Sequence, residues 1–128
     1  MLSTPKVMGL HLHYRLWIAE MNYDINVLRI FEDYLTELSS KRTEPEVTKG
    51  VEEFKTKFLA SRQQIDDLRH EMHLLKMKLA EYSREGRSYD NDNYKQDDHD
   101  QLQERYKSFR KEFEQLKTNF SKFESEWL

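Results

Sequence analysis

Three stretches of the chain carry apolar residues at alternating steps of four and three positions. The first runs from Leu10 to Leu38, the second from Val51 to Tyr82, and the third from His99 to Trp127. A repeat of this period places the side chains along one line of an α-helix, whereas a half-buried strand alternates at every second residue. We call these three lines the seams. Seams of this length predict an all-α protein of long, coiled-coil-like helices.

The seams predict helices over about 5–40, 44–84 and 93–127. The chain has only 3 glycines and 2 prolines, too few for the many turns of a β fold. Its 128 residues suit a single domain, 1–128. Short connections between matched helices favour an antiparallel up-down-up three-helix bundle. The pattern resembles spectrin-like three-helix rods, a resemblance of architecture that implies no function.

The registers of the three seams agree with one another. In an antiparallel pair, the numbers of facing residues add up to a constant. Phe31 with Phe58 and Leu10 with Leu79 both total 89, and Leu79 with His99 totals 178. We expect His99 to be a frayed end of the third seam. A closed bundle within one chain is the simplest arrangement, and a hairpin completed by a second chain is the alternative.

The first helix has more apolar residues than its seam requires. Leu16, Tyr23 and Ile30 flank the seam and are expected to widen the core. Four further residues fall on the outer side, where the other two helices carry mainly charged or amide side chains: Ile18, Ile25, Val27 and Tyr34. Contiguous exposed apolar surface is uncommon on monomers. We therefore predict these four as an interface with a protein partner, most simply in a twofold homodimer, with burial in the core as the alternative.

Asp24 occupies a seam position in the middle of the first helix, at the level of Ile65 and Phe113. A lone buried carboxylate is costly, and such groups mark functional sites when their pKa is shifted. The simpler interpretation is a polar residue that fixes the register or leans toward solvent, helped by Arg62 or Lys117. The alternative is an enzyme or small-ligand binder with its site around Asp24.

No other motif points to catalysis or to a cofactor. Four histidines lie off the seams: His11, His13, His70 and His73. The last two are one residue short of the His-Glu-x-x-His spacing of zinc proteases. The chain has no cysteine and no glycine-rich phosphate loop. We expect no catalytic residue, no metal and no cofactor, and hence a non-enzymatic interaction or scaffold protein.

Charge and hydropathy argue against two further classes of partner. The net charge of −3 and a pI near 6.0 are unlike the basic face of a nucleic-acid-binding domain. No stretch approaches 18 apolar residues without charges, so we expect no membrane partner. The segment Met1–Leu12 lacks the positive start and apolar core of a signal peptide, which favours the cytoplasm.

Overall fold

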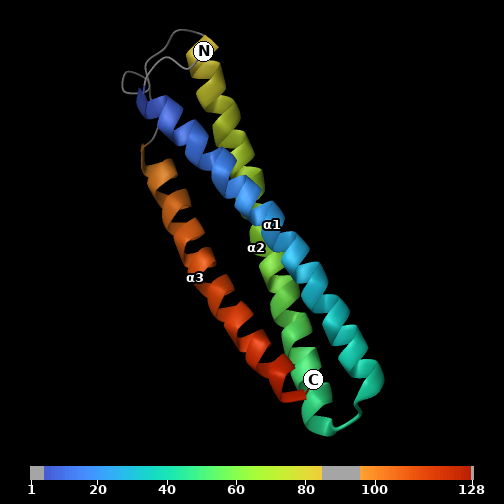
Figure 1. Cartoon of the computed structure of the whole chain (residues 1–128). Helices are drawn as coiled ribbons and strands as arrows, with labels where there is room; N and C mark the ends of the chain where they lie inside the picture. Colours follow the sequence, from blue (N-terminus) through green and yellow to red (C-terminus); the bar gives the residue numbers. More distant parts are fainter. Residues whose placement is uncertain (1–4, 85–95, 128) are drawn as a thin grey trace.

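The computed structural model describes residues 5–84 and 96–127, which form three long helices (Figure 1). Helix α1 spans Pro5–Lys41, α2 spans Pro45–Arg84 and α3 spans Gln96–Trp127. Helix α2 folds back along α1, and α3 runs beside them in the direction of α1. No strand occurs in the described ranges. The predicted all-α, up-down-up three-helix bundle is confirmed, and the expected start of the third helix at 93 lies outside the described residues.

A tight turn joins α1 to α2. The Arg42 amide donates a hydrogen bond to the Leu38 carbonyl (2.9 Å), and the Thr48 amide donates to the Glu44 carbonyl (3.1 Å). Pro45 is the first residue of α2, a position where the missing N–H of proline costs no helical hydrogen bond. The Arg42 guanidinium donates to the Glu44 carboxylate across the turn (2.8 Å). These contacts hold the two helices in a closed hairpin.

Three phenylalanines, one from each helix, meet at a single level of the bundle. The ring centroids of Phe31 and Phe58 are 5.7 Å apart, those of Phe58 and Phe120 are 5.4 Å apart, and those of Phe31 and Phe120 are 4.5 Å apart. The first two pairs have the totals of 89 and 178 that the seams predict. Trp17 stacks on Tyr106 at 5.0 Å, and this pair has the same sequence separation as Phe31 and Phe120. The predicted register therefore holds over several turns of α1 and α3.

Near the hairpin end, α2 approaches α3 closely at Gly50. A methyl group at this position would collide with the ring of Phe123. The absence of a side chain therefore lets the ring pack against the backbone of α2, where it also contacts Phe54 at a centroid distance of 5.1 Å. The packing of Phe123 on Gly50 and Phe54 therefore holds the C-terminal end of α3 against α2.

The phenylalanine contacts make a quantitative prediction. Phe58 is fully buried, so Phe58→Ala should lower the free energy of unfolding by about 3–5 kcal/mol, through lost apolar contacts and the cavity left behind. Its neighbour Leu59 is 65% exposed and provides a matched control, and Leu59→Ala should change the free energy by no more than about 0.5 kcal/mol. Urea denaturation followed by circular dichroism measures both. Equal effects of the two substitutions would contradict the register.

Candidate interaction surface

The structure places most of the predicted interface residues inside the bundle. Ile18 is buried, with 8% of its surface exposed, and Ile25 and Val27 are half-buried against the core. Only Tyr34, 45% exposed, lies at the surface as expected. The prediction of an outward-facing stripe is therefore wrong for three of its four members, and the alternative of core burial describes them.

The reason is that α2 and α3 contact both flanks of α1. On one flank, Asn22 accepts a hydrogen bond from Arg69 of α2 (2.7 Å), and Ile18 and Ile25 lie one helical turn before and after it. On the other flank, Asp24 is bonded to α3, and Val27 follows one turn later. The covered sector of α1 is therefore wider than its seam alone indicates.

A different set of apolar side chains on α1 is exposed to solvent. We call this set the outer face of α1, and its exposed fractions run from 45% to 64%: Leu12, Leu16, Tyr23, Ile30 and Tyr34. At about 100° of rotation per residue, all five fall within a sector of roughly 40°. The outer face is therefore a straight apolar line along one side of the helix.

The sequence contained a signal for this line. Leu16, Tyr23 and Ile30 each follow a seam residue by two positions, and two residues correspond to a rotation of about 200° in an α-helix. They consequently point away from the core rather than widening it, which corrects the sequence-based expectation. Heptad spacing shows only that the three residues share one side of the helix. Their offset of two residues from the seam shows that this side is away from the core.

Helix α3 has no comparable surface. Within its described residues it has no large hydrophobic side chain that is exposed, whereas α2 has Leu59, Leu74 and Met77. Leu74 and Met77 on α2 lie one turn apart but Leu59 is 15 residues away, and among the described helices only α1 aligns five exposed apolar side chains. The apolar surface of the bundle is therefore concentrated on the outer face of α1.

Asp24 is buried, with 1% of its surface exposed, and has a specific partner on α3. The Arg110 guanidinium donates to both carboxylate oxygens, with Nη1 3.1 Å from Oδ1 and Nη2 2.6 Å from Oδ2. Neither suggested helper plays this role, because Arg62 pairs with Glu32 and Lys117 pairs with Glu114. The expectation that Asp24 leans toward solvent is therefore wrong, and its charge is neutralised within the bundle.

Arg110 is the centre of a polar cluster between α1 and α3. Besides Asp24, it donates to the Tyr106 hydroxyl at 2.9 Å and lies 3.1 Å from Glu20 and 3.5 Å from Glu114. The Tyr106 hydroxyl in turn donates to the Glu20 carboxylate. A bidentate guanidinium–carboxylate pair is strongly directional, so it holds α1 and α3 at one relative height. The cluster has the chemistry of a structural crosslink.

His99 lies near the N-terminal end of α3, and it is buried rather than part of a frayed helix end. It is 2% exposed, and its Nδ1 is hydrogen-bonded to the hydroxyl of Tyr14, whose ring stacks on the imidazole at 5.5 Å. Burial lowers the pKa of His99 to about 4, although the nearby Asp98 and Asp100 raise it and Lys78 lowers it further. His99 is therefore neutral at physiological pH and belongs to the core.

Of the remaining histidines, His11 is half-buried, and His13, His70 and His73 are exposed. Burial lowers the pKa of His11 and of His73, and the charge of Lys76 adds to both effects. Within residues 5–84 and 96–127, no group of three or more His, Cys, Asp or Glu side chains is arranged to hold a metal ion. In the same ranges, no helix combines the length and apolar character needed to cross a bilayer.

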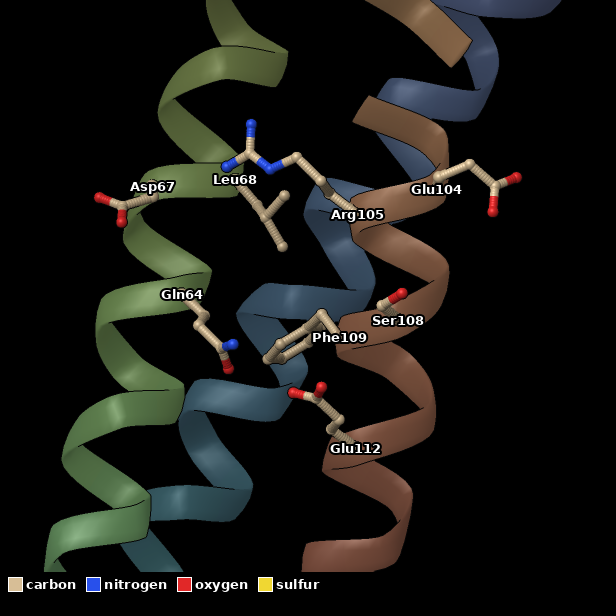
Figure 2. Close-up of a pocket in the computed structure, with 8 residues that line it drawn as sticks. All are labelled: Gln64, Asp67, Leu68, Glu104, Arg105, Ser108, Phe109 and Glu112. Atoms are coloured by element: carbon tan, nitrogen blue, oxygen red, sulfur yellow. The ribbon is translucent and has the colours of Figure 1, made fainter. Parts of the chain in front are cut away.

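A surface groove lies between α2 and α3 (Figure 2). Its volume is about 340 Å³, and the buried side chains of Leu68 and Phe109 form its floor. Carboxylates surround the opening, but those of Asp67 and Glu104 point in opposite directions in Figure 2. Gln64 and Glu112 extend toward the groove in Figure 2, whereas Asp67 and Glu104 point away from it.

Comparison of the chain with family models, with curated proteins and with solved structures found no match.

The buried pair makes a prediction about stability. Arg110→Met removes the cation from buried Asp24 and should cost about 3–5 kcal/mol of unfolding free energy. Asp24→Leu should cost less, because Arg110 keeps Glu20 and Glu114 as neighbours. The double variant Asp24→Leu/Arg110→Met should recover most of the loss, because apolar side chains replace buried ion pairs with little or no net cost. A double-mutant cycle in urea measures the coupling, and additive losses would show that the pair does not act as a unit.

A second prediction concerns pH. The pKa of His99 is lower in the folded chain (about 4) than its ordinary value of 6.5, so the unfolded chain binds the proton more readily. The free energy of unfolding should therefore be unaffected by His99 above about pH 7. It should fall as the pH drops from about 6.5 to 4, by roughly 3 kcal/mol in total.

Urea denaturation at pH 7 and at pH 4.5 tests this by comparing the wild type with His99→Asn. The substitution should lower the free energy at neutral pH and reduce the further loss at acid pH. His13, which is exposed, provides the matched control, and His13→Asn should keep the wild-type pH dependence. If His99→Asn and the wild type lose equal stability on acidification, another group is responsible.

Proposed function

We propose that this chain is a non-enzymatic protein–protein interaction or scaffold module, and that its contact surface is the outer face of α1. The observation that carries the proposal is the straight line of five exposed apolar side chains on the side of α1 opposite the core. Their exposed area is on the order of 500 Å², which is toward the upper end of the apolar patches found on monomers. A surface of this kind favours association with another polypeptide.

Rigidity also supports an interaction role. Helix α1 has 37 residues and a length of about 55 Å, so its outer face presents side chains at fixed spacings along a rod. The aromatic contacts and the Asp24–Arg110 pair fix this helix against α3 on the side away from the outer face. A preorganised surface loses little conformational entropy on binding, so more of the apolar burial appears as affinity.

The geometry around Asp24 gives no support to the alternative of an enzyme or ligand-binding site. Both carboxylate oxygens accept hydrogen bonds from Arg110, a group that stays protonated in proteins. The side chain is buried and does not line the groove between α2 and α3. General acid or base catalysis requires a group within reach of a substrate proton, and Asp24 has no such access.

The proposal is tested by a photo-crosslinking amino acid placed at Tyr23 in cells. A discrete adduct should form at position 23, because this side chain is the most exposed of the outer face. The matched control is Lys111, an exposed residue of α3, where no such adduct should form.

The double variant Leu16→Lys/Ile30→Lys should abolish the adduct at position 23 while circular dichroism shows unchanged helicity. Both side chains are more than half exposed, so their replacement does not disturb the core. The same crosslinking pattern at positions 23 and 111, or an adduct that survives the double substitution, would refute the proposal. The cytoplasmic location stays part of the proposal, and fractionation of cells expressing the tagged chain tests it.

A further inference from the structure

The spacing of the outer face reads the same in both directions. From Leu12 to Leu16, Tyr23, Ile30 and Tyr34, the steps are 4, 7, 7 and 4 residues, with Tyr23 at the centre. A twofold axis perpendicular to α1 at Tyr23 therefore maps every member of the outer face onto the level of another member. We propose that the partner of the outer face is a second copy of this chain, packed antiparallel with Tyr23 on the twofold axis. The inference rests on the proposed function, whose contact surface it uses.

The antiparallel arrangement gives each apolar side chain an apolar counterpart. Leu16 comes level with Ile30 of the second copy, Leu12 comes level with Tyr34, and the two Tyr23 rings meet at the axis. A twofold contact is isologous, so each of these pairs occurs twice except the one on the axis. The antiparallel direction also places opposite ends of the two helix dipoles together.

Charges beside the outer face favour the same direction. Arg15 and Asp33 are exposed and lie toward opposite ends of the line. In the antiparallel dimer, Arg15 lies about two residues, or roughly 3 Å along the axis, from the level of Asp33 of the second copy. In a parallel dimer, Arg15 and Asp33 of the second copy would be 18 residues, or roughly 27 Å, apart along the axis and could not pair. Complementary charges of this kind select orientation more than they add affinity.

The available area is sufficient for a stable dimer. A standard protein interface buries roughly 800 Å² on each partner, and about 60% of that area is apolar. The exposed surface of the outer face, on the order of 500 Å² per copy, is of the size of this apolar area without a contribution from α3. The face opposite the core is also the side on which a second helix can approach without displacing α2 or α3.

The absence of cysteine from the chain allows a direct test of orientation. Three single variants, Leu16→Cys, Tyr23→Cys and Ile30→Cys, are treated with a short bis-maleimide, and Lys111→Cys on α3 is the control. Tyr23→Cys should crosslink to itself. Leu16→Cys should not, because the two thiols of an antiparallel pair would be about 21 Å apart along the axis. An equimolar mixture of tagged Leu16→Cys and untagged Ile30→Cys should give the mixed dimer.

Charge exchange provides an independent measurement. Arg15→Asp and Asp33→Arg should each weaken the dimer about tenfold in sedimentation equilibrium, and the double variant should recover the wild-type affinity. In a parallel dimer, the two positions are too far apart for such recovery. Efficient self-crosslinking of Leu16→Cys, or no recovery in the double variant, would overturn the antiparallel arrangement.

The outcomes separate this inference from the proposed function. A wild-type mass of about 31 kDa, twice the 15.7 kDa of the chain, supports self-association, provided that Leu16→Lys/Ile30→Lys gives the monomer mass. A monomer at every soluble concentration refutes the dimer. If position 23 then gives a discrete adduct of another mass in cells, the interaction module stands and its partner is a different protein. If position 23 gives no adduct, both proposals fail.

Discussion

The contact of Phe31, Phe58 and Phe120 joins all three helices at one level, and the rest of the bundle is aligned by it. Each ring is wide enough to reach two neighbouring helices, so a single layer fixes α1 against α2, α2 against α3 and α1 against α3. The layers above and below, several of which also contain aromatic rings, then follow from the helical repeat. A core made of one column of side chains is sensitive to alignment, because a shift of one helix displaces every layer together.

Polar residues in the seam restrict the alignment further. Apolar layers tolerate sliding better than hydrogen bonds do, because the attraction between apolar surfaces has little dependence on direction. Asp24 and Arg110 require a particular height of α3 relative to α1, and Tyr14 and His99 require the same relative height nearer the other end of α3. Each of these polar side chains is costly to bury unless its hydrogen-bonding partner is in place. The two pairs therefore disfavour alternative packings that the aromatic side chains alone would permit.

The sequence predicted the fold and the register because both depend on periodicity. Residue totals of 89 and 178 follow from the positions of large apolar residues, and the phenylalanine contacts have these totals. The partner of Asp24 was not predicted, because Arg110 follows the seam residue Phe109 and looks like a solvated flanking charge. Its long side chain nevertheless reaches back between α1 and α3, and only the packing of the two helices shows where the guanidinium lies.

The outer face of α1 was misplaced for a related reason. A seam defines which side of a helix is buried but not how wide the buried sector is, and this width depends on where the neighbouring helices lie. Ile18 and Ile25 pack against the core on the flank of α1 that Arg69 and Arg62 of α2 also reach. Tyr23 and Ile30 lie beyond this flank and stay exposed. Long arginine side chains thus set the edge of the core as well as its charge balance.

The Asp24–Arg110 pair also constrains how the chain can evolve. A sequence that loses Arg110 leaves Asp24 as an uncompensated buried charge, at a cost that is a large part of the roughly 5–15 kcal/mol by which domains are usually stable, whereas one that loses Asp24 keeps Glu20 and Glu114 beside Arg110. A sequence that changes both positions to apolar residues escapes this cost. The order of change therefore matters: replacing Asp24 first costs less than replacing Arg110 first. Although 86 residues separate them in the chain, the residue that one position tolerates depends on the residue at the other.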